Sequence, residues 1–335
     1  MRIAIHAVNI NTGGALVLLN EMLEKFHSFG GMVDLYISSK VELKVYKVFN
    51  NTKVIKCRSL IRSLYLKREY DRVVFFGNLP PLNNVNNSYL YIHNAYLASD
   101  NKIHNASFGF KVKIFLLKKY IRFFIRNVDF VVCQTVSMKD NISKLYDANV
   151  YISPFYKFMP IDESIKEYDF CYIGLPSIHK NHSLLLKVLE LLKNEGVNIT
   201  IALTVPDSPC NFELINRINN LNKSSNIKIV NFGFVSIEDV VNIYLKSKAL
   251  IFPSKIESYG LPLIEAAMLN LTIFAPDKNY VNDVIKDYYA INIEDANDIK
   301  VKLKRFVENN ELYKMAKVIT PNKFIGDIMK GTIDD

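Results

Sequence analysis

The sequence predicts an α/β protein with two Rossmann-like domains that face a central cleft. Short apolar runs alternate with longer segments of helical periodicity, which is typical of parallel sheets covered by helices on both faces. This pattern restarts after Ser153-Pro154-Phe155, which divides the chain into domains 1–155 and 156–335. The length of 335 residues also suits two domains of ordinary size.

The elements of the first domain follow from the period of its apolar residues. Strands are predicted at residues 3–7, 33–37, 73–76, 89–93, 130–133 and 150–152. Leu16, Leu19 and Leu23 repeat at helical spacing after the first strand, and a further helix is predicted at residues 136–145. The first domain therefore alternates strand and helix along most of its length.

The second domain repeats this arrangement. Strands are predicted at residues 170–173, 199–203, 227–230, 249–252, 271–274 and 289–291, and helices at residues 182–194, 212–221, 237–246 and 263–269. We expect the last helix of the chain to pack back on the first domain. Because open parallel sheets bind ligands at the carboxyl ends of their strands, the cleft is the expected site.

Composition and charge exclude several classes of protein. Half of the residues are hydrophobic and 22% are charged, as in ordinary globular proteins. No apolar run approaches the length of a membrane-spanning helix, and the N-terminus is predicted to be a strand rather than a signal peptide. The four cysteines, Cys57, Cys133, Cys171 and Cys210, lack metal-ligand or redox spacing, which favours the cytoplasm.

The most specific motif spans residues 253–267, after a predicted buried strand and into a helix. Pro262 suits a first helical turn, where its missing N–H would be unpaired. Gly260 allows the backbone to approach a ligand closely, and the helix start offers N–H groups to a diphosphate. Glu257 lies before the helix and Glu265 one turn inside it, so both can face one pocket.

This motif resembles the E-x(7)-E signature of the retaining glycosyltransferases of group 1, which have the GT-B fold. The resemblance implies that Glu257 is a catalytic residue at the donor sugar and that Glu265 binds the ribose hydroxyls. It also assigns four residues of the motif to donor binding, namely Ser258, Tyr259, Gly260 and Leu261. The alternative is an exposed loop acid followed by a helix-capping acid.

A second motif, residues 172–181, leaves the first strand of the second domain and contains Lys180. The resemblance gives Lys180 a catalytic and donor-binding role at the diphosphate, where a fixed cation stabilises the negative charge that develops on the leaving group. The alternative is a solvated loop lysine. Many family members have arginine after the glycine, whereas this chain has Leu175.

Weaker signals lie in three other loops. Phe234 and Val235 follow a predicted strand and would border the nucleotide base by resemblance. Gly14, in Asn11–Ala15, would let the donor approach the backbone, and His93 would contact the sugar or the acceptor. An ordinary turn and a structural histidine are the alternatives. No D-x-D motif or metal cluster is seen in the sequence, so neither a metal nor a cofactor is expected.

The positive charge is concentrated in the first domain. Residues 1–155 hold 21 Lys and Arg against 10 Asp and Glu, a net +11, whereas residues 156–335 hold 21 against 23, a net −2. Residues 111–126 form a basic, Phe-rich helical pattern that can lie on an anionic inner membrane surface. A helix with a buried apolar face and a solvated basic face is the alternative. No nucleic-acid-binding motif is recognisable.

These observations predict a cytoplasmic enzyme associated peripherally with the membrane. We expect retaining transfer of a hexose or N-acetylhexosamine from a nucleoside-diphosphate sugar, UDP first and GDP next, to a lipid-linked saccharide. Such a reaction belongs to bacterial surface polysaccharide biosynthesis, for example of O-antigen, lipopolysaccharide or capsule. The alternatives are a sugar-nucleotide epimerase or hydrolase on the same fold, and a catalytically silent binding subunit.

Overall fold

A computed structural model describes the chain apart from residues 11, 44–45, 58–68, 100–106, 161, 163, 310–313, 332 and 334–335. The chain divides into two compact units. Unit 1 contains Met1–Lys157 and Thr320–Asp335, and unit 2 contains Phe158–Ile319. Within the described ranges, no helix combines the length and the apolarity that crossing a membrane requires.

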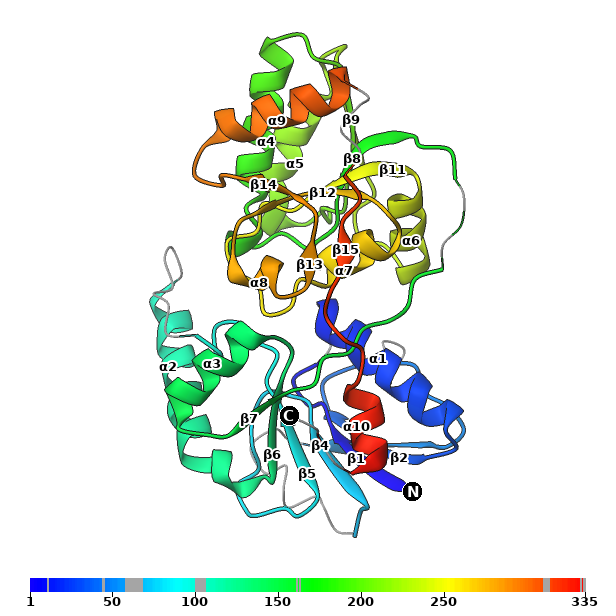
Figure 1. The fold of residues 1–335 in the computed structure, drawn as a ribbon, viewed down its shortest axis with the longest axis vertical. Helices are drawn as coiled ribbons and strands as arrows, with labels where there is room; N and C mark the ends of the chain where they lie inside the picture. Colours follow the sequence, from blue (N-terminus) through cyan, green and yellow to red (C-terminus); the bar gives the residue numbers. More distant parts are fainter. Residues whose placement is uncertain are drawn as a thin grey trace. The chain divides into compact units, whose positions relative to one another are not determined.

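Unit 1 is built on a seven-stranded sheet in the order β3-β2-β1-β4-β5-β6-β7 (Figure 1). All of its strand pairs are parallel. The strands are β1 (Arg2–His6), β2 (Met32–Ser38), β3 (Thr52–Cys57), β4 (Arg72–Phe75), β5 (Ser88–Tyr91), β6 (Phe130–Cys133) and β7 (Val150–Ile152). The helices are α1 (Gly13–Ser28), α2 (Phe108–Phe124), the 3₁₀ turn η3 (Ile125–Asn127), α3 (Val136–Tyr146) and α10 (Phe324–Lys330).

The C-terminal helix α10 belongs to unit 1 because its side chains enter that core. The ring of Phe324 lies 4.4 Å from that of Tyr91, measured between centroids. The hydroxyl of Ser153 donates a hydrogen bond to the buried carboxylate of Asp327. A buried polar pair of this kind is satisfied only when the helix docks in one position.

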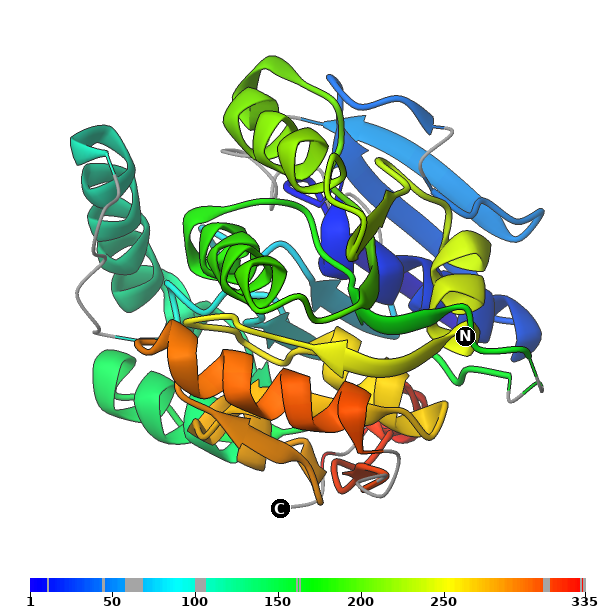
Figure 2. The ribbon, with the colours of Figure 1, turned by 90° about the horizontal axis from the view of Figure 1, so that it is seen from above.

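Unit 2 repeats the architecture with a six-stranded parallel sheet in the order β10-β9-β8-β11-β12-β14. Its strands are β8 (Tyr168–Tyr172), β9 (Ile199–Leu203), β10 (Ile227–Asn231), β11 (Ser247–Ile251), β12 (Thr272–Pro276) and β14 (Tyr289–Ile291), and β13 (Ile285–Lys286) pairs with β15 (Lys317–Val318). The helices are α4 (His182–Asn194), α5 (Phe212–Leu221), α6 (Ile237–Leu245), α7 (Leu261–Met268), α8 (Asn279–Asn282) and α9 (Ala296–Glu308), with 3₁₀ turns η4 (Ile178–Lys180) and η5 (Pro209–Asn211). Helix α9, orange in Figure 2, packs beside α4.

The predicted α/β class with two Rossmann-like sheets is confirmed. In each sheet the chain adds strands outward on one side of its first strand and then on the other. This change of side, the topological switch point, lies between β1 and β4 in unit 1 and between β8 and β11 in unit 2. The loops that leave the two strands at such a point diverge to opposite faces of the sheet, which opens a crevice for ligands at their carboxyl ends. This topology therefore makes the loops after β8 and β11 the expected ligand-binding part of unit 2.

Candidate active site

Lys180 and Glu257 meet at the switch point of unit 2. The ammonium Nζ of Lys180 lies 2.6 Å from the carboxylate Oε1 of Glu257. Lys180 comes from the loop after β8 and Glu257 from the loop after β11, and these strands are hydrogen-bonded neighbours. Their side chains are only 15% and 12% exposed, so the pair is largely withdrawn from water.

The loop around Lys180 is fixed by local contacts. Tyr172, at the end of β8, donates its hydroxyl to the carbonyl of Lys180 at 2.6 Å. Asn181 follows with a positive φ of 59°, which turns the chain into α4. A side chain on Gly174 would touch the stem of Lys180 at 3.8 Å, and the ammonium lies 5.2 Å from the ring centroid of Phe252. The lysine head is thereby held in one place.

The loop around Glu257 is tied to the lysine loop. The buried hydroxyl of Ser254 donates to Glu257 Oε1 at 2.6 Å. The backbone N–H of Lys255 donates to the carbonyl of His179 at 2.7 Å, which joins the two loops directly. Tyr280, from α8, donates its hydroxyl to the carbonyl of Ser254 at 2.6 Å. Glu257 is therefore a positioned carboxylate, and the alternative of an exposed loop acid is not what the structure shows.

Helix α7 begins at the motif as predicted, with its N-terminus just after Glu257. Gly260 caps it with a positive φ of 71°, and a Cβ there would lie 2.9 Å from Leu263 Cδ1. Pro262 stands in the first turn. The first N–H groups of a helix have no partner inside it, so this end attracts anions. Tyr259 belongs to the residues predicted to bind the donor, but its ring is buried. Only the backbone of Tyr259 is therefore placed to contact a ligand.

Glu265 lies one turn inside α7 in a dense environment. Burial raises the pKa of its carboxyl to about 7, although the hydroxyl of Tyr244 and the charge of Lys180 both act to lower it. Tyr244, on α6, is fully buried and donates to Glu265 Oε2 at 3.0 Å. Neither Tyr244 nor Tyr280 was predicted from the sequence, since each is one tyrosine among 19 and stands in no recognisable motif.

The loop after β10 carries the two side chains predicted to border a base. Phe234 is 77% exposed and Val235 is half-buried. Asn231 holds the loop, since its side-chain amide exchanges hydrogen bonds with the backbone of Val205, both at 2.9 Å. Leu175 is 40% exposed in the loop that follows β8. These loops thus present apolar side chains to a ligand.

Two predicted site residues lie in unit 1. Gly14 is exposed in the first turn of α1, whereas Asn11 of the same loop lies outside the described residues. His93 lies two residues beyond β5 rather than in it, which corrects the predicted strand 89–93. Its Nε2 is 2.8 Å from the carbonyl of Phe76, and its ring stacks on Phe76 at 4.8 Å.

This setting defines the protonation of His93. Burial lowers the pKa of the imidazole to about 4, against the raising effect of the Phe76 carbonyl, so the ring is neutral at pH 7. Nε2 lies 2.8 Å from the carbonyl oxygen of Phe76 and 3.1 Å from the amide nitrogen Nδ2 of Asn78. A neutral imidazole has one nitrogen that donates and one that accepts. His93 can therefore accept a hydrogen bond from a hydroxyl, but it is not a cation.

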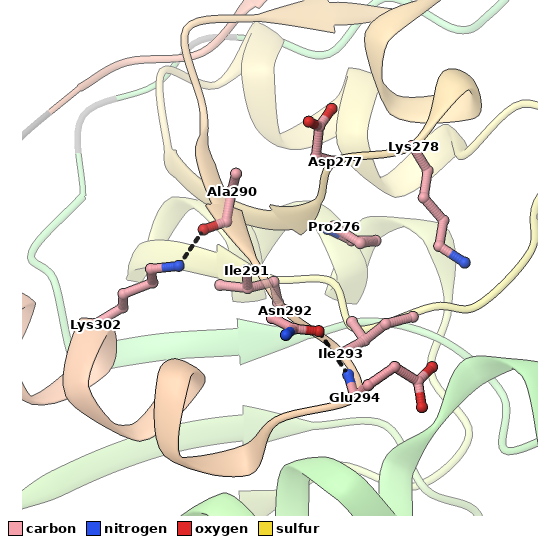
Figure 3. A pocket seen from close by; sticks show the side chains of 9 residues that line it. All are labelled: Pro276, Asp277, Lys278, Ala290, Ile291, Asn292, Ile293, Glu294 and Lys302. Atoms are coloured by element: carbon pink, nitrogen blue, oxygen red, sulfur yellow. Dashed lines mark hydrogen bonds between the residues drawn. The ribbon is translucent and has the colours of Figure 1, made fainter.

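A hollow of about 440 Å³ lies elsewhere in unit 2, at the ends of β12 and β14 (Figure 3). Two polar groups of its lining are paired within the hollow: Lys302 donates to the carbonyl of Ala290, and the N–H of Glu294 donates to Asn292. Lys180, Glu257 and Glu265 do not line it. We therefore place the candidate site at the switch point. Among the described residues, no group of His, Cys, Asp or Glu is arranged to hold a metal ion.

Comparison with known proteins points to one family for unit 2. Residues 158–322 match the family model of glycosyl transferases group 1. A stretch of 124 residues is 32% identical to the serotype-specific mannosyltransferase WbdA of Escherichia coli, covering 36% of this chain and 14% of WbdA. The chain thus spans a small part of that relative. The O-antigen chain mannosyltransferase RfbU of Salmonella typhimurium is 23% identical over 282 residues, which are 76% of this chain and 75% of RfbU.

Solved structures share the fold over nearly the whole chain. A sucrose-phosphate synthase of Thermosynechococcus elongatus aligns with a TM-score of 0.71 at 12% identity, over 94% of this chain and 91% of the synthase. HepE of Anabaena, in complex with UDP and glucose, aligns with a TM-score of 0.66 at 10% identity, over 94% of this chain and 91% of HepE. At these identities the likeness concerns the fold.

Proposed function

Because residues 158–322 place this chain among the group 1 glycosyltransferases, which have the GT-B fold, we propose that it is a retaining glycosyltransferase. It moves a hexose or N-acetylhexosamine from a nucleoside-diphosphate sugar to an acceptor hydroxyl. The observation that carries this proposal is the Lys180–Glu257 pair, 2.6 Å apart at the switch point and followed by the N-terminus of α7.

Lys180 and the start of α7 bind the donor diphosphate in this proposal. A lysine ammonium has three N–H donors, and Glu257 takes one of them, which leaves donors for phosphate oxygens. When the bond from the anomeric carbon to the phosphate oxygen breaks, its electron pair stays on the diphosphate. The negative charge on the leaving group grows, so a fixed cation and helix N–H groups stabilise the transition state more than the ground state.

Glu257 acts at the sugar. Lys180 and Ser254 engage its Oε1, and Oε2 is the oxygen left to accept hydrogen bonds from sugar hydroxyls. The acceptor oxygen bonds to the anomeric carbon on the face that the diphosphate leaves, and its proton passes to the departing diphosphate. The anomeric configuration is then retained without a second carboxylate on the opposite face.

Glu265 binds the ribose hydroxyls in its ionised form, since a carboxylate accepts hydrogen bonds that are stronger than those of a neutral acid. Phe234 and Val235 border the base, and the backbone of Ser258, Gly260 and Leu261 faces the diphosphate. Gly14 and His93 remain predictions of the family resemblance. The neutral imidazole of His93 suits a hydrogen bond from a sugar hydroxyl.

The donor is proposed to be a UDP-sugar first and a GDP-sugar next, and HepE with UDP and glucose supports the choice of UDP. The acceptor is proposed to be a lipid-linked saccharide of a bacterial surface polysaccharide. RfbU, named an O-antigen chain mannosyltransferase, supports this choice. No metal or cofactor takes part in the proposed reaction. The enzyme acts in the cytoplasm, at the inner face of the membrane.

Product analysis tests the proposal. The chain is incubated with UDP-, GDP- and ADP-sugars and with lipid acceptors extracted from bacterial membranes, and the products are analysed by mass. A glycosylated lipid is the expected product. Free sugar or an epimerised donor would instead indicate a hydrolase or an epimerase, and donor binding without turnover would indicate a silent binding subunit. Leu175 in place of an arginine is the observation that favours this last alternative.

A further inference from the structure

Helix α2 of unit 1 has two apolar faces, and in the part of unit 1 that the structure describes one of them is buried and the other exposed. Ile114 and Ile121 are buried on the inner face, where α2 packs on the core of unit 1. The opposite side carries five exposed apolar residues, which we call the outer face of α2: Phe108 (82% exposed), Val112 (39%), Phe115 (58%), Leu116 (60%) and Phe123 (68%). Their spacings of three, four and seven residues place them on one side of the helix.

The charges on α2 have one sign. From Phe108 to Asn127 the sequence contains six Lys and Arg and no Asp or Glu. Lys118 and Arg122 donate to the carbonyls of Ser99 and Leu145, so these two side chains serve the fold. The remaining four cations, Lys111, Lys113, Lys119 and Arg126, are exposed among and beside the apolar residues of the outer face. This side of α2 therefore combines aromatic rings with four exposed cations that form no ion pair with the described residues.

We propose that the outer face of α2 docks on an anionic lipid bilayer, with the helix in the plane of the interface and its Phe and Leu side chains inserted between headgroups. Large exposed aromatics among cations suit a surface that is both apolar and negatively charged. A second copy of this chain would oppose one cationic helix with another, and a nucleic acid would leave the apolar residues in water. In Figures 1 and 2, α2 lies at the edge of unit 1, beside α3.

This docking extends the proposed function, since a lipid-linked acceptor is found at such a surface. It rests on α2 alone and needs neither a donor nor turnover to be observed. Because the attraction between exposed charges is screened over about 10 Å at 0.1 M salt, docking should weaken steeply as salt is raised. It should also be weak on neutral vesicles, where only the apolar side chains contribute.

An introduced tryptophan tests the insertion, because the sequence contains no Trp of its own. The variant Phe115→Trp places the probe on the outer face of α2. The control Phe29→Trp places it at the end of α1, where Phe29 is also 58% exposed. With phosphatidylglycerol vesicles, we expect a blue shift of Phe115→Trp fluorescence and quenching by brominated lipid chains. No shift for Phe115→Trp, or equal shifts for both variants, would overturn the insertion.

A pair of charge variants tests the electrostatic part. The triple change Lys111→Gln, Lys119→Gln and Arg126→Gln removes three cations of α2. The control changes three exposed lysines of the same unit, Lys40, Lys53 and Lys56, to Gln. In sedimentation with the same vesicles, the partition coefficient of the α2 triple variant should be at least tenfold lower than that of the wild type. The control should partition as the wild type does. Equal losses, or no loss, would contradict docking through α2.

Titration with UDP and GDP separates this inference from the proposed function. Both triple variants should bind nucleotide as the wild type does, since Lys180, Glu257 and Glu265 are unchanged and circular dichroism verifies the fold. A chain that docks on vesicles but binds no nucleotide would refute the proposed function alone. A chain that binds nucleotide but ignores anionic vesicles would refute the docking alone.

Discussion

The protonation of Glu265 gives a sharp test of the proposed nucleotide site. Burial raises the pKa of this carboxyl to about 7 in the folded chain. If the ionised form binds the ribose, affinity for a nucleotide-sugar should fall as the pH is lowered through 7. With that pKa the ionised fraction is about 10/11 at pH 8 and about 1/11 at pH 6, so the apparent affinity should fall about tenfold between them.

The assay is calorimetric titration from pH 6 to pH 8 with an intact nucleotide-sugar, whose diphosphate keeps its charge throughout this range. Glu265→Gln should bind more weakly at pH 8, by about 1–3 kcal/mol for a lost charge-assisted hydrogen bond. Its affinity should not change with pH. A pH dependence that survives in Glu265→Gln would refute the assignment of Glu265 to the ribose.

Tyr244→Phe provides a second variant for the same assay. The hydroxyl of Tyr244 lies 3.0 Å from Glu265 Oε2 and lowers the carboxyl pKa. Its removal should therefore move the midpoint of the pH profile upward. A merely structural role of Tyr244 would lower affinity equally at every pH, and that outcome would contradict Tyr244 as a positioning residue for Glu265.

Three further predictions concern turnover and stability. Lys180→Ala should lower kcat roughly 10²-fold. The control Lys187→Ala, on the exposed face of α4, should leave kcat unchanged. Near-normal turnover of Lys180→Ala would mean that another cation stabilises the leaving diphosphate. Gly260→Ala should lower the free energy of unfolding by about 1–2 kcal/mol, because the backbone of Gly260 has a positive φ. Thermal unfolding measures this loss, and Gly109→Ala is the control because Gly109 has open space around it. The raised pKa of Glu265 means that its contribution to stability is present below pH 4.5 and lost as pH rises through 7. Urea unfolding should therefore find Glu265→Gln more stable than wild type by about 1–3 kcal/mol at pH 8, with no gain at pH 4; a gain at both pH values would contradict this cause.

Sequence patterns predicted the central strands of both sheets because these are continuous apolar runs. They missed β3, an edge strand in which five of the six residues are half-buried or exposed, so that it contains no clear apolar run. They also missed α9, in which six of 13 residues are Asp, Glu, Lys or Arg and only Ala296, Ile299, Leu303 and Phe306 are buried. Edge strands and helices rich in charged residues contain few apolar residues in a row, so their pattern in the sequence is harder to recognise.

The sequence carries a signal for part of the geometry of the candidate site, and the site's role stays a prediction. Gly260, Pro262 and the spacing of Glu257 and Glu265 carry a local signal, because each has a backbone or helical requirement that can be read from neighbouring residues. The contact of Lys180 with Glu257 has no local signal in the sequence, since 77 residues separate the two and they meet through the pairing of β8 with β11. Tyr244 reaches Glu265 in the same way, from a separate helix.

The most direct test of the central claim compares product formation by the wild type and Glu257→Gln, using a donor that the wild type binds. Glu190→Gln is the control, since Glu190 lies in the same unit and pairs with Arg217 on the surface. We predict a glycosylated lipid from the wild type and from Glu190→Gln, and a yield at least 10²-fold lower, on the scale of a lost electrostatic stabiliser, from Glu257→Gln. Undiminished transfer by Glu257→Gln, or no transfer by the wild type with any donor and lipid acceptor, would contradict the account.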